Sequence, residues 1–166
     1  EAGEAQRHHR RPGVQAHPLV LIAATEEGYA NLVRLVSRAY LDVPAGEPPH
    51  VEAGWLAPLS QGIVCLTGGV RGPVGAALKA DHAAQAEARL LLLKDVFGDR
   101  LYVELQRYAG HDRAVEAATI ELAYAHGLPL VATNEAFFPA RDDYEAHDAL
   151  LAIADGSVVA VDERRR

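Results

Sequence analysis

The 166-residue chain has a formal net charge of -7, and 49% of its residues are hydrophobic while 23% are charged. This balance excludes wholesale disorder and is enough for one domain with a sizeable core. It also argues against DNA binding by the isolated domain, because phosphate contacts need clustered Lys and Arg. No apolar run approaches the roughly 20 residues of a membrane span, and no secretory signal opens the sequence. We therefore expect a cytoplasmic protein that makes no membrane contact.

The chain opens on a polar stretch, residues 1–17, which favours a loop or arm. Its His8-His9 pair is a weak metal candidate, because adjacent side chains point apart and no Cys or acidic partner stands at ligand spacing. An apolar run at 19–23 then predicts a strand. Residues 26–41 follow with helical periodicity, and the apolar positions that set this period are Tyr29, Leu32, Val33, Val36 and Tyr40.

A Pro-rich connection leads to a second predicted strand at 62–67, in which Cys65 is expected to be a buried structural thiol. Glycines then break the strand. The next helix is predicted over 81–98, with Asp81 as its N-cap and Gly98 closing it. Its core-facing side chains are expected to be Ala86, Leu90, Leu93 and Phe97.

A third strand is predicted at 101–106, and the helix after it is stopped by Gly127 and then Pro129. The fourth strand is expected at 128–132. A helix follows, with Asp142 as N-cap and Glu145 three residues later, which resembles a capping box. The stretch 157–161 reads as a fifth strand or an extended exit, and residues 161–166 as a charged tail.

Strands that alternate with helices predict an α/β fold with parallel strands. Two architectures fit this order, an open doubly wound sheet and part of a closed barrel. A complete (β/α) barrel usually needs about 250 residues, so this chain would form only part of one.

Three polar residues lie where such folds place their chemistry. Glu104 interrupts an apolar strand, and a buried carboxylate is costly unless it is paired, so it is either a base or ligand or is bonded to an Arg or a backbone amide. Asn134 and Glu135 follow the fourth strand, and working groups lie past the carboxyl ends of parallel strands. An Asn there can equally bond the loop backbone.

Other motifs are weaker. The turn "TGGVRG" at 67–72 could cradle a phosphate, but Gly68 and Gly69 are adjacent, so it fails the G-x-G-x-x-G pattern and is more simply a tight turn. His147 is more typical of a core or interface position than of a catalytic one. From the residues alone, the chain is a soluble α/β domain with a weak site.

Three stretches together resemble a known family: "LVLIAATEEGYANLVRLVSRAYL", "YVELQRYAGHDRAVEAATIELAYAHGLPLVATNEAFF" and "DDYEAHDALLAIADG". They are similar to the amino-terminal domain of bacterial replicative DNA polymerase III alpha subunits, a member of the polymerase and histidinol phosphatase (PHP) superfamily. The resemblance covers residues 18–160. It implies a distorted (β/α)7 barrel with a metal cluster at the strand ends, whose first strands and H-x-H motif would precede residue 1. We therefore expect this chain to be a fragment of a longer polymerase.

The resemblance also allows a residue-by-residue check of the ligand positions. Four of them fall in this chain, and all four depart from the family's set of ligands: Pro18, Gly69, Glu135 and Phe137. Only Glu135 keeps a carboxylate, whereas Pro, Gly and Phe offer a metal no side-chain lone pair. We therefore expect a degenerate site without metal, in which Phe137 fills the former metal corner by apolar packing. Glu104, Asn134 and Glu135 would be a residual polar site.

The resemblance implies a catalytically silent domain that acts as a scaffold, contacts the rest of the polymerase subunit and docks the separate proofreading exonuclease subunit. The parent protein would be a DNA-directed DNA polymerase that uses magnesium. One alternative is a metal-dependent phosphoesterase or 3'-5' proofreading exonuclease. A second alternative is a nucleotide-binding module that uses the "TGGVRG" turn.

Overall fold

The structure is a computed structural model that describes residues 16–108, 112–134 and 136–161. The chain divides into two compact units, one that ends at Thr133 and one that begins at Asn134. The predicted arm, residues 1–17, and the predicted tail, residues 161–166, fall mostly outside the described residues. The domain boundaries at 17/18 and 160/161 therefore stay predictions. None of the helices in the described part of the chain is long and apolar enough to cross a membrane.

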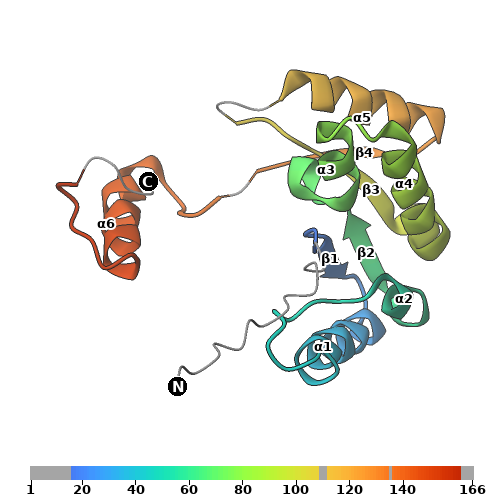
Figure 1. The fold of residues 1–166 in the computed structure, drawn as a ribbon, viewed down its shortest axis with the longest axis horizontal. Helices are drawn as coiled ribbons and strands as arrows, with labels where there is room; N and C mark the ends of the chain where they lie inside the picture. Colours follow the sequence, from blue (N-terminus) through green and yellow to red (C-terminus); the bar gives the residue numbers. More distant parts are fainter. Residues whose placement is uncertain (1–15, 109–111, 135, 162–166) are drawn as a thin grey trace, which may run out of the picture. The chain divides into compact units, whose positions relative to one another are not determined.

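Strands and helices alternate along the first unit (Figure 1). The strands are β1 Val20–Ala23, β2 Ile63–Leu66, β3 Leu101–Gln106 and β4 Leu130–Thr133. The α-helices are α1 Glu26–Leu41, α2 Ala53–Leu56, α3 Pro73–Lys79, α4 Ala83–Phe97 and α5 Arg113–Ala125. Short 3-10 turns lie at Ala57–Leu59, Gly69–Arg71 and Gly98–Arg100. The α/β class predicted from the sequence is confirmed.

The described strands form one open four-stranded sheet in the order β1-β2-β3-β4. Strands β2, β3 and β4 are parallel, as predicted, but β1 pairs with β2 antiparallel. The prediction of a parallel first strand is wrong, and the sheet within the described residues does not close into a barrel. Barrel closure therefore stays an expectation from the resemblance.

The antiparallel pairing follows from where the connection after α1 returns. The chain comes back at Gly62, whose carbonyl oxygen accepts a hydrogen bond from the N–H of Ala24 at 2.8 Å. The second strand thus starts at the end where the first one stops. Alternation of strands and helices cannot reveal this, because it does not say which end of the sheet a connection reaches.

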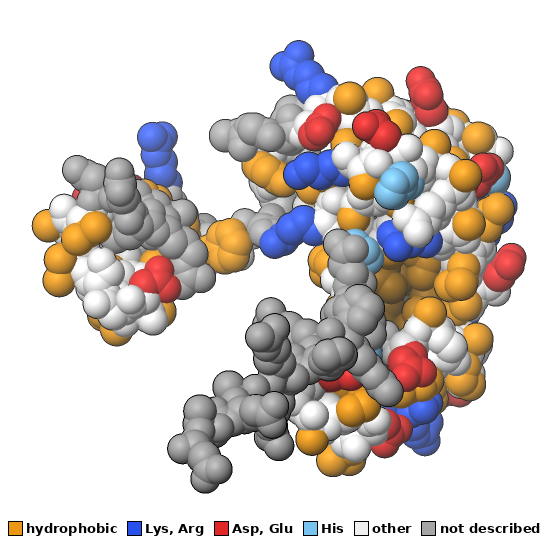
Figure 2. All heavy atoms as spheres, viewed as in Figure 1, with side chains coloured by type: hydrophobic (Ala, Val, Ile, Leu, Met, Phe, Trp, Pro, Cys, Tyr) orange, Lys and Arg blue, Asp and Glu red, His pale blue; other side chains and the backbone are white. Residues whose placement is uncertain are grey.

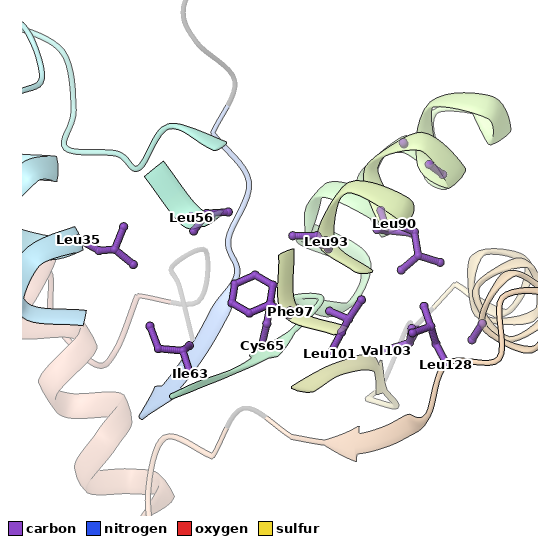
Figure 3. Close-up of a cluster of buried hydrophobic side chains, with 14 residues drawn as sticks. Leu35, Leu56, Ile63, Cys65, Leu90, Leu93, Phe97, Leu101, Val103 and Leu128 are labelled. Atoms are coloured by element: carbon purple, nitrogen blue, oxygen red, sulfur yellow. The ribbon is translucent and has the colours of Figure 1, made fainter. Parts of the chain in front are cut away.

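The hydrophobic core lies between the sheet and the helices, and α4 supplies its predicted face (Figure 3). Phe97 is 1% exposed and belongs to the same buried cluster as Cys65 of β2. Leu35 of α1 and Leu56 of α2 join the same cluster. The predicted core positions on α4 are all buried, namely Ala86, Leu90, Leu93 and Phe97.

The five apolar positions that set the helical period of α1 are not its buried face. Only Leu32 among them packs against the core, and the other four are exposed. The buried positions of this helix are Gly28, Asn31, Leu35 and Ala39. A small residue and an amide are buried there because α1 approaches the backbone around Gly62 closely: a Cβ built on Gly28 would lie 1.9 Å from the Gly62 carbonyl oxygen.

Two predicted helix caps are also wrong. The residue before α4 is His82, and Asp81 has a positive φ of 57° in the turn ahead of it. Residues Arg141–Asp143 form a 3-10 turn before the last helix, and Asp143, not Asp142, accepts a hydrogen bond from the N–H of Ala140 at 3.2 Å. The predicted stop of α5 is correct, since Gly127 adopts φ 63°.

The second unit contains the helix α6, Tyr144–Ala154. The ring of His147 packs within this unit against Phe137, with ring centroids 5.7 Å apart, and against Phe138 at 5.2 Å. Residues 157–161 form loop and turn structure. They do not form the fifth strand that the sequence allowed.

Candidate functional site

The carboxyl ends of β2, β3 and β4 converge on one buried carboxylate, that of Glu104 on β3. Glu104 is 3% exposed. One of its oxygens, Oε2, accepts the backbone N–H of Gly68 at 2.9 Å. The other, Oε1, accepts the hydroxyl of Thr133 at the end of β4 and the side-chain amide of Gln106 at 3.3 Å. The carboxylate is thus bonded to a backbone amide, one of the two pairings that the sequence left open.

A reciprocal hydrogen bond completes this polar corner, which we define as Thr67, Gly68, Glu104, Gln106 and Thr133. The hydroxyl oxygen of Thr67, just past β2, accepts the backbone N–H of Glu104 at 2.9 Å. The corner therefore joins three neighbouring strands through side chains. Neither Gln106 nor Thr133 is among the predicted site residues, and Thr67 enters only as part of the 67–72 turn; the signal that all three share is their place at the ends of predicted strands.

The glycine turn after β2 forms one wall of the corner. Gly68 and Gly69 both have positive φ, 78° and 57°, a backbone conformation that glycine adopts at no steric cost. A Cβ on Gly68 would lie 2.2 Å from the carbonyl oxygen of Pro18, and one on Gly69 would lie 2.7 Å from Oε1 of Gln106. Two of the predicted ligand positions, Pro18 and Gly69, thus flank the corner, but they meet it through backbone atoms only.

The remaining predicted site residues lie in the second unit. Asn134 is exposed, and Glu135 falls outside the described residues. Phe137 is 68% exposed and its ring stacks on His147 of the same unit; its packing into the former metal corner stays a prediction. The residual polar site therefore has one described and buried member, Glu104.

The space beside the corner is small. A cavity of about 30 Å³ lies against Gly69, Glu104 and Gln106, which is room for about one or two water molecules and far too little for a nucleotide. The Gly68 N–H, which a phosphate would need, is already bonded to Glu104. Within the part of the chain that the structure describes, no three His, Cys, Asp or Glu side chains are grouped to hold a metal ion.

The charge of Glu104 reaches Cys65 in the core beneath it. Burial, with a smaller contribution from the negative charge of Glu104, raises the pKa of Cys65 to about 12. The thiol therefore stays protonated at neutral pH and is a poor nucleophile. On the surface nearby, Arg107 forms a bidentate ion pair with Glu116, whose hydrogen bonds raise the pKa of Arg107.

A larger apolar groove of about 780 Å³ lies on the same unit. Leu19 and Leu21 beside and within β1 line it together with Leu92 and Leu93 of α4. Figure 2 shows a hollow lined with hydrophobic side chains on the face that is drawn. Polar side chains also line the groove, namely His17, His50, Glu52 and Arg89. Within the described residues, however, no three His, Cys, Asp or Glu side chains are grouped to hold a metal ion.

Comparisons with known proteins agree with one another. The model of the PHP domain family matches residues 1–108. The DNA polymerase III subunit alpha of Caulobacter vibrioides is 46% identical over 153 residues, which cover 92% of this chain and 13% of that subunit. The subunits of the same name from Pasteurella multocida and Escherichia coli K12 are 38% and 36% identical over 86% and 89% of this chain.

The matched relatives are much longer than this chain, which spans about an eighth of their length: 13%, 12% and 13% of the three subunits. The family match covers more than half of the chain and includes β1 through β3 and the polar corner residues Thr67, Gly68, Glu104 and Gln106. The resemblance seen in the sequence is confirmed, and this chain belongs to the PHP domain family.

Proposed function

We propose that this chain is a segment of a DNA polymerase III alpha subunit, and that its PHP domain is catalytically silent and serves as a scaffold for the proofreading exonuclease subunit. The observation that carries the proposal is that the buried carboxylate of Glu104 is hydrogen-bonded to groups of the protein itself. The family resemblance implies a metal cluster at the strand ends, and at this edge of the sheet the carboxylate of Glu104 accepts hydrogen bonds from Gly68, Gln106 and Thr133 instead.

The donor set at the strand ends does not fit the metal cluster that the family implies. A catalytic metal needs about three protein ligands held together. At the matched positions, Pro18 and Gly69 have no side-chain donor, and the Phe137 ring has no lone pair to give. Glu104 would have to give up its protein hydrogen bonds before it could bind a cation, and a buried polar group left without a partner costs about 1–3 kcal/mol.

The same bonds support a scaffold role. Thr67, Glu104 and Thr133 connect the ends of three strands through their side chains, which holds these strand ends together. A rigid surface is a favourable docking site, because little conformational entropy is lost on binding. The exonuclease subunit is proposed as the partner on the basis of the family resemblance.

Metal content tests the silent-domain proposal. Elemental analysis of the purified, tag-free full alpha subunit is expected to find no stoichiometric zinc, manganese or iron. The subunit should also show no metal-dependent phosphatase activity above the background rate of the assay. The Glu104→Gln variant should give the same background rate. One equivalent of zinc or manganese that is lost on Glu135→Ala, or phosphatase activity that is lost in Glu104→Gln, would favour the phosphoesterase alternative instead.

Partner binding tests the scaffold proposal. A pull-down compares the full alpha subunit with one from which this segment is deleted, and the deleted subunit is expected to lose the exonuclease. DNA polymerase activity of both proteins, measured with magnesium, is the control that the remainder still folds. Equal recovery of the exonuclease by an active, deleted subunit would refute docking through this segment.

DNA binding gives a further check. The isolated chain carries a net charge of -7, so we expect weak DNA binding that fades steeply with salt. As part of a bacterial replication enzyme, the domain would act in the cytoplasm. Tight, salt-resistant binding of DNA, or of a nucleotide at the 67–72 turn, would contradict the scaffold role.

A further inference from the structure

Helix α1 presents an exposed apolar stripe, the α1 seam, which the polar corner does not use. The seam consists of Tyr29, Val33, Val36 and Tyr40, whose exposed fractions are 66%, 48%, 56% and 71%. These residues follow one another at intervals of four, three and four positions. That spacing places them in a narrow line along the helix, which is the pattern by which one helix packs against another.

The helix that carries the seam is held firmly on its adjacent face. Thr25 caps its N-terminus by accepting the N–H of Gly28 at 3.1 Å. Asn31 donates a hydrogen bond from Nδ2 to the carbonyl of Gln61 at 3.0 Å, and Leu35 is buried in the core at 2% exposure. The seam is therefore a fixed surface of the folded unit, and its exposure does not come from a frayed helix.

The charges around the seam argue for a protein partner. The first turn of α1 carries Glu26 and Glu27, whereas helices that lie on a membrane surface are typically rich in Lys and Arg on their polar face. Arg38, near the other end, is paired with Asp42 at 3.0 Å. A line of aromatic and β-branched side chains without free basic residues beside it fits the apolar face of another helix.

We propose that the α1 seam packs against a helix of the same, longer polypeptide, outside these 166 residues. A stable interface between separate proteins takes about 20–30 residues on each side, and the seam offers four. A helix in the same chain needs far fewer contacts, because its effective concentration is in the millimolar range or above. The relatives supply the necessary length, since this chain covers only 13% of the Caulobacter subunit.

This inference rests on the proposed assignment of the chain to an alpha subunit, and does not rest on exonuclease docking. The test places the photocrosslinking residue p-benzoylphenylalanine at Val36 or Tyr40 in the full-length subunit, and at Glu27 as the control. Glu27 is exposed on the opposite side of the same helix. After irradiation and digestion, mass spectrometry identifies the crosslinked peptides.

We expect both seam positions to crosslink to a peptide of the same subunit outside this segment, one with apolar residues at helical spacing, and Glu27 to give background. Polymerase activity of each labelled subunit shows that it is folded. Background-level crosslinking from both seam positions, crosslinks to the second unit of this segment, or crosslinks to a second copy of the subunit would overturn the inference. Running the reaction with and without the exonuclease separates the two proposals: crosslinks to the exonuclease itself would overturn this inference while supporting docking.

Discussion

Helices α4 and α1 carry apolar side chains at the same intervals of four, three and four positions, yet they place them in opposite environments. On α4 the line runs Ala86, Leu90, Leu93 and Phe97, and every member is at most 3% exposed. On α1 the corresponding line is the seam, and every member is at least 48% exposed. Spacing therefore identifies a face that can pack against something, but it does not identify what the face packs against.

The buried side of α1 shows what decided the orientation of that helix. Gly28 lies against the backbone of Gly62, and the amide of Asn31 bonds the carbonyl of Gln61. Close approach and hydrogen bonding turned this side inward, and among its four buried residues only Leu35 has a large apolar side chain. The α4 side is governed by apolar burial, whereas the α1 side is governed by contact with backbone atoms.

The largest expected effect contrasts the two apolar lines directly. In the 166-residue chain, Phe97→Ala should lower the free energy of unfolding by about 3–5 kcal/mol, because it leaves a cavity in the core. Tyr40→Ala should change it by no more than about 0.5 kcal/mol, as is usual for a surface position. Urea unfolding measures both, and equal losses would mean that Tyr40 is buried in solution.

A second pair of variants tests the close approach at the buried side of α1. Gly28→Ala should destabilise the chain by about 1–3 kcal/mol, because the new Cβ forces the two backbones apart. Gly54→Ala in α2 is the matched control, since a Cβ there meets nothing within 4 Å. The control should be neutral or slightly stabilising by thermal unfolding. Tolerance of Ala at position 28 would show that the backbones are further apart than described.

Asn31→Leu asks whether an apolar residue can replace the amide on that side. Although Leu suits a buried helical position, the variant leaves the carbonyl of Gln61 without its donor and Arg34 without its acceptor at 2.8 Å. We expect a loss of about 1–2 kcal/mol in the free energy of unfolding. A stabilised variant would mean that the α1 side is governed by apolar burial after all.

Cys65 belongs to the same buried cluster as Phe97. The pH dependence of the free energy of unfolding at Cys65 is the smallest expected effect, and it reports whether water is excluded from the core beneath α4. The folded pKa of Cys65, about 12, is above the usual value of 9.0, so the unfolded thiol ionises first as the pH rises. The contribution of this thiol to the free energy of unfolding is fully present below pH 9. Above pH 9, the free energy of unfolding should fall by about 1 kcal/mol per pH unit. Cys65→Ala should remove that part of the slope in urea titrations at pH 8 to 10.5.

Much of the fold could be predicted because its signals are local. Strand β3 and the end of α5 at Gly127 were predicted to within a residue or two, since a short apolar run and a glycine with positive φ act through their immediate neighbours. The direction of β1 could not be predicted, because it depends on where Gly62 returns after a long connection. Burial of Glu104 could be anticipated from its strand, whereas its partners Thr67 and Thr133 come from other strands and are visible only in three dimensions.

The two hydrogen bonds that join Glu104 to Thr67 and Gly68 have a consequence for amide hydrogen exchange. The β2–β3 ladder contains only two residue pairs, Cys65 with Leu101 and Leu66 with Tyr102. Beyond it, the N–H of Glu104 is held by the Thr67 hydroxyl and the N–H of Gly68 by the Glu104 carboxylate. Both amides should therefore exchange with deuterium as slowly as strand amides, although their acceptors are side chains. Thr67→Val, which keeps the side-chain shape, should accelerate exchange at Glu104 while Gly68 stays protected.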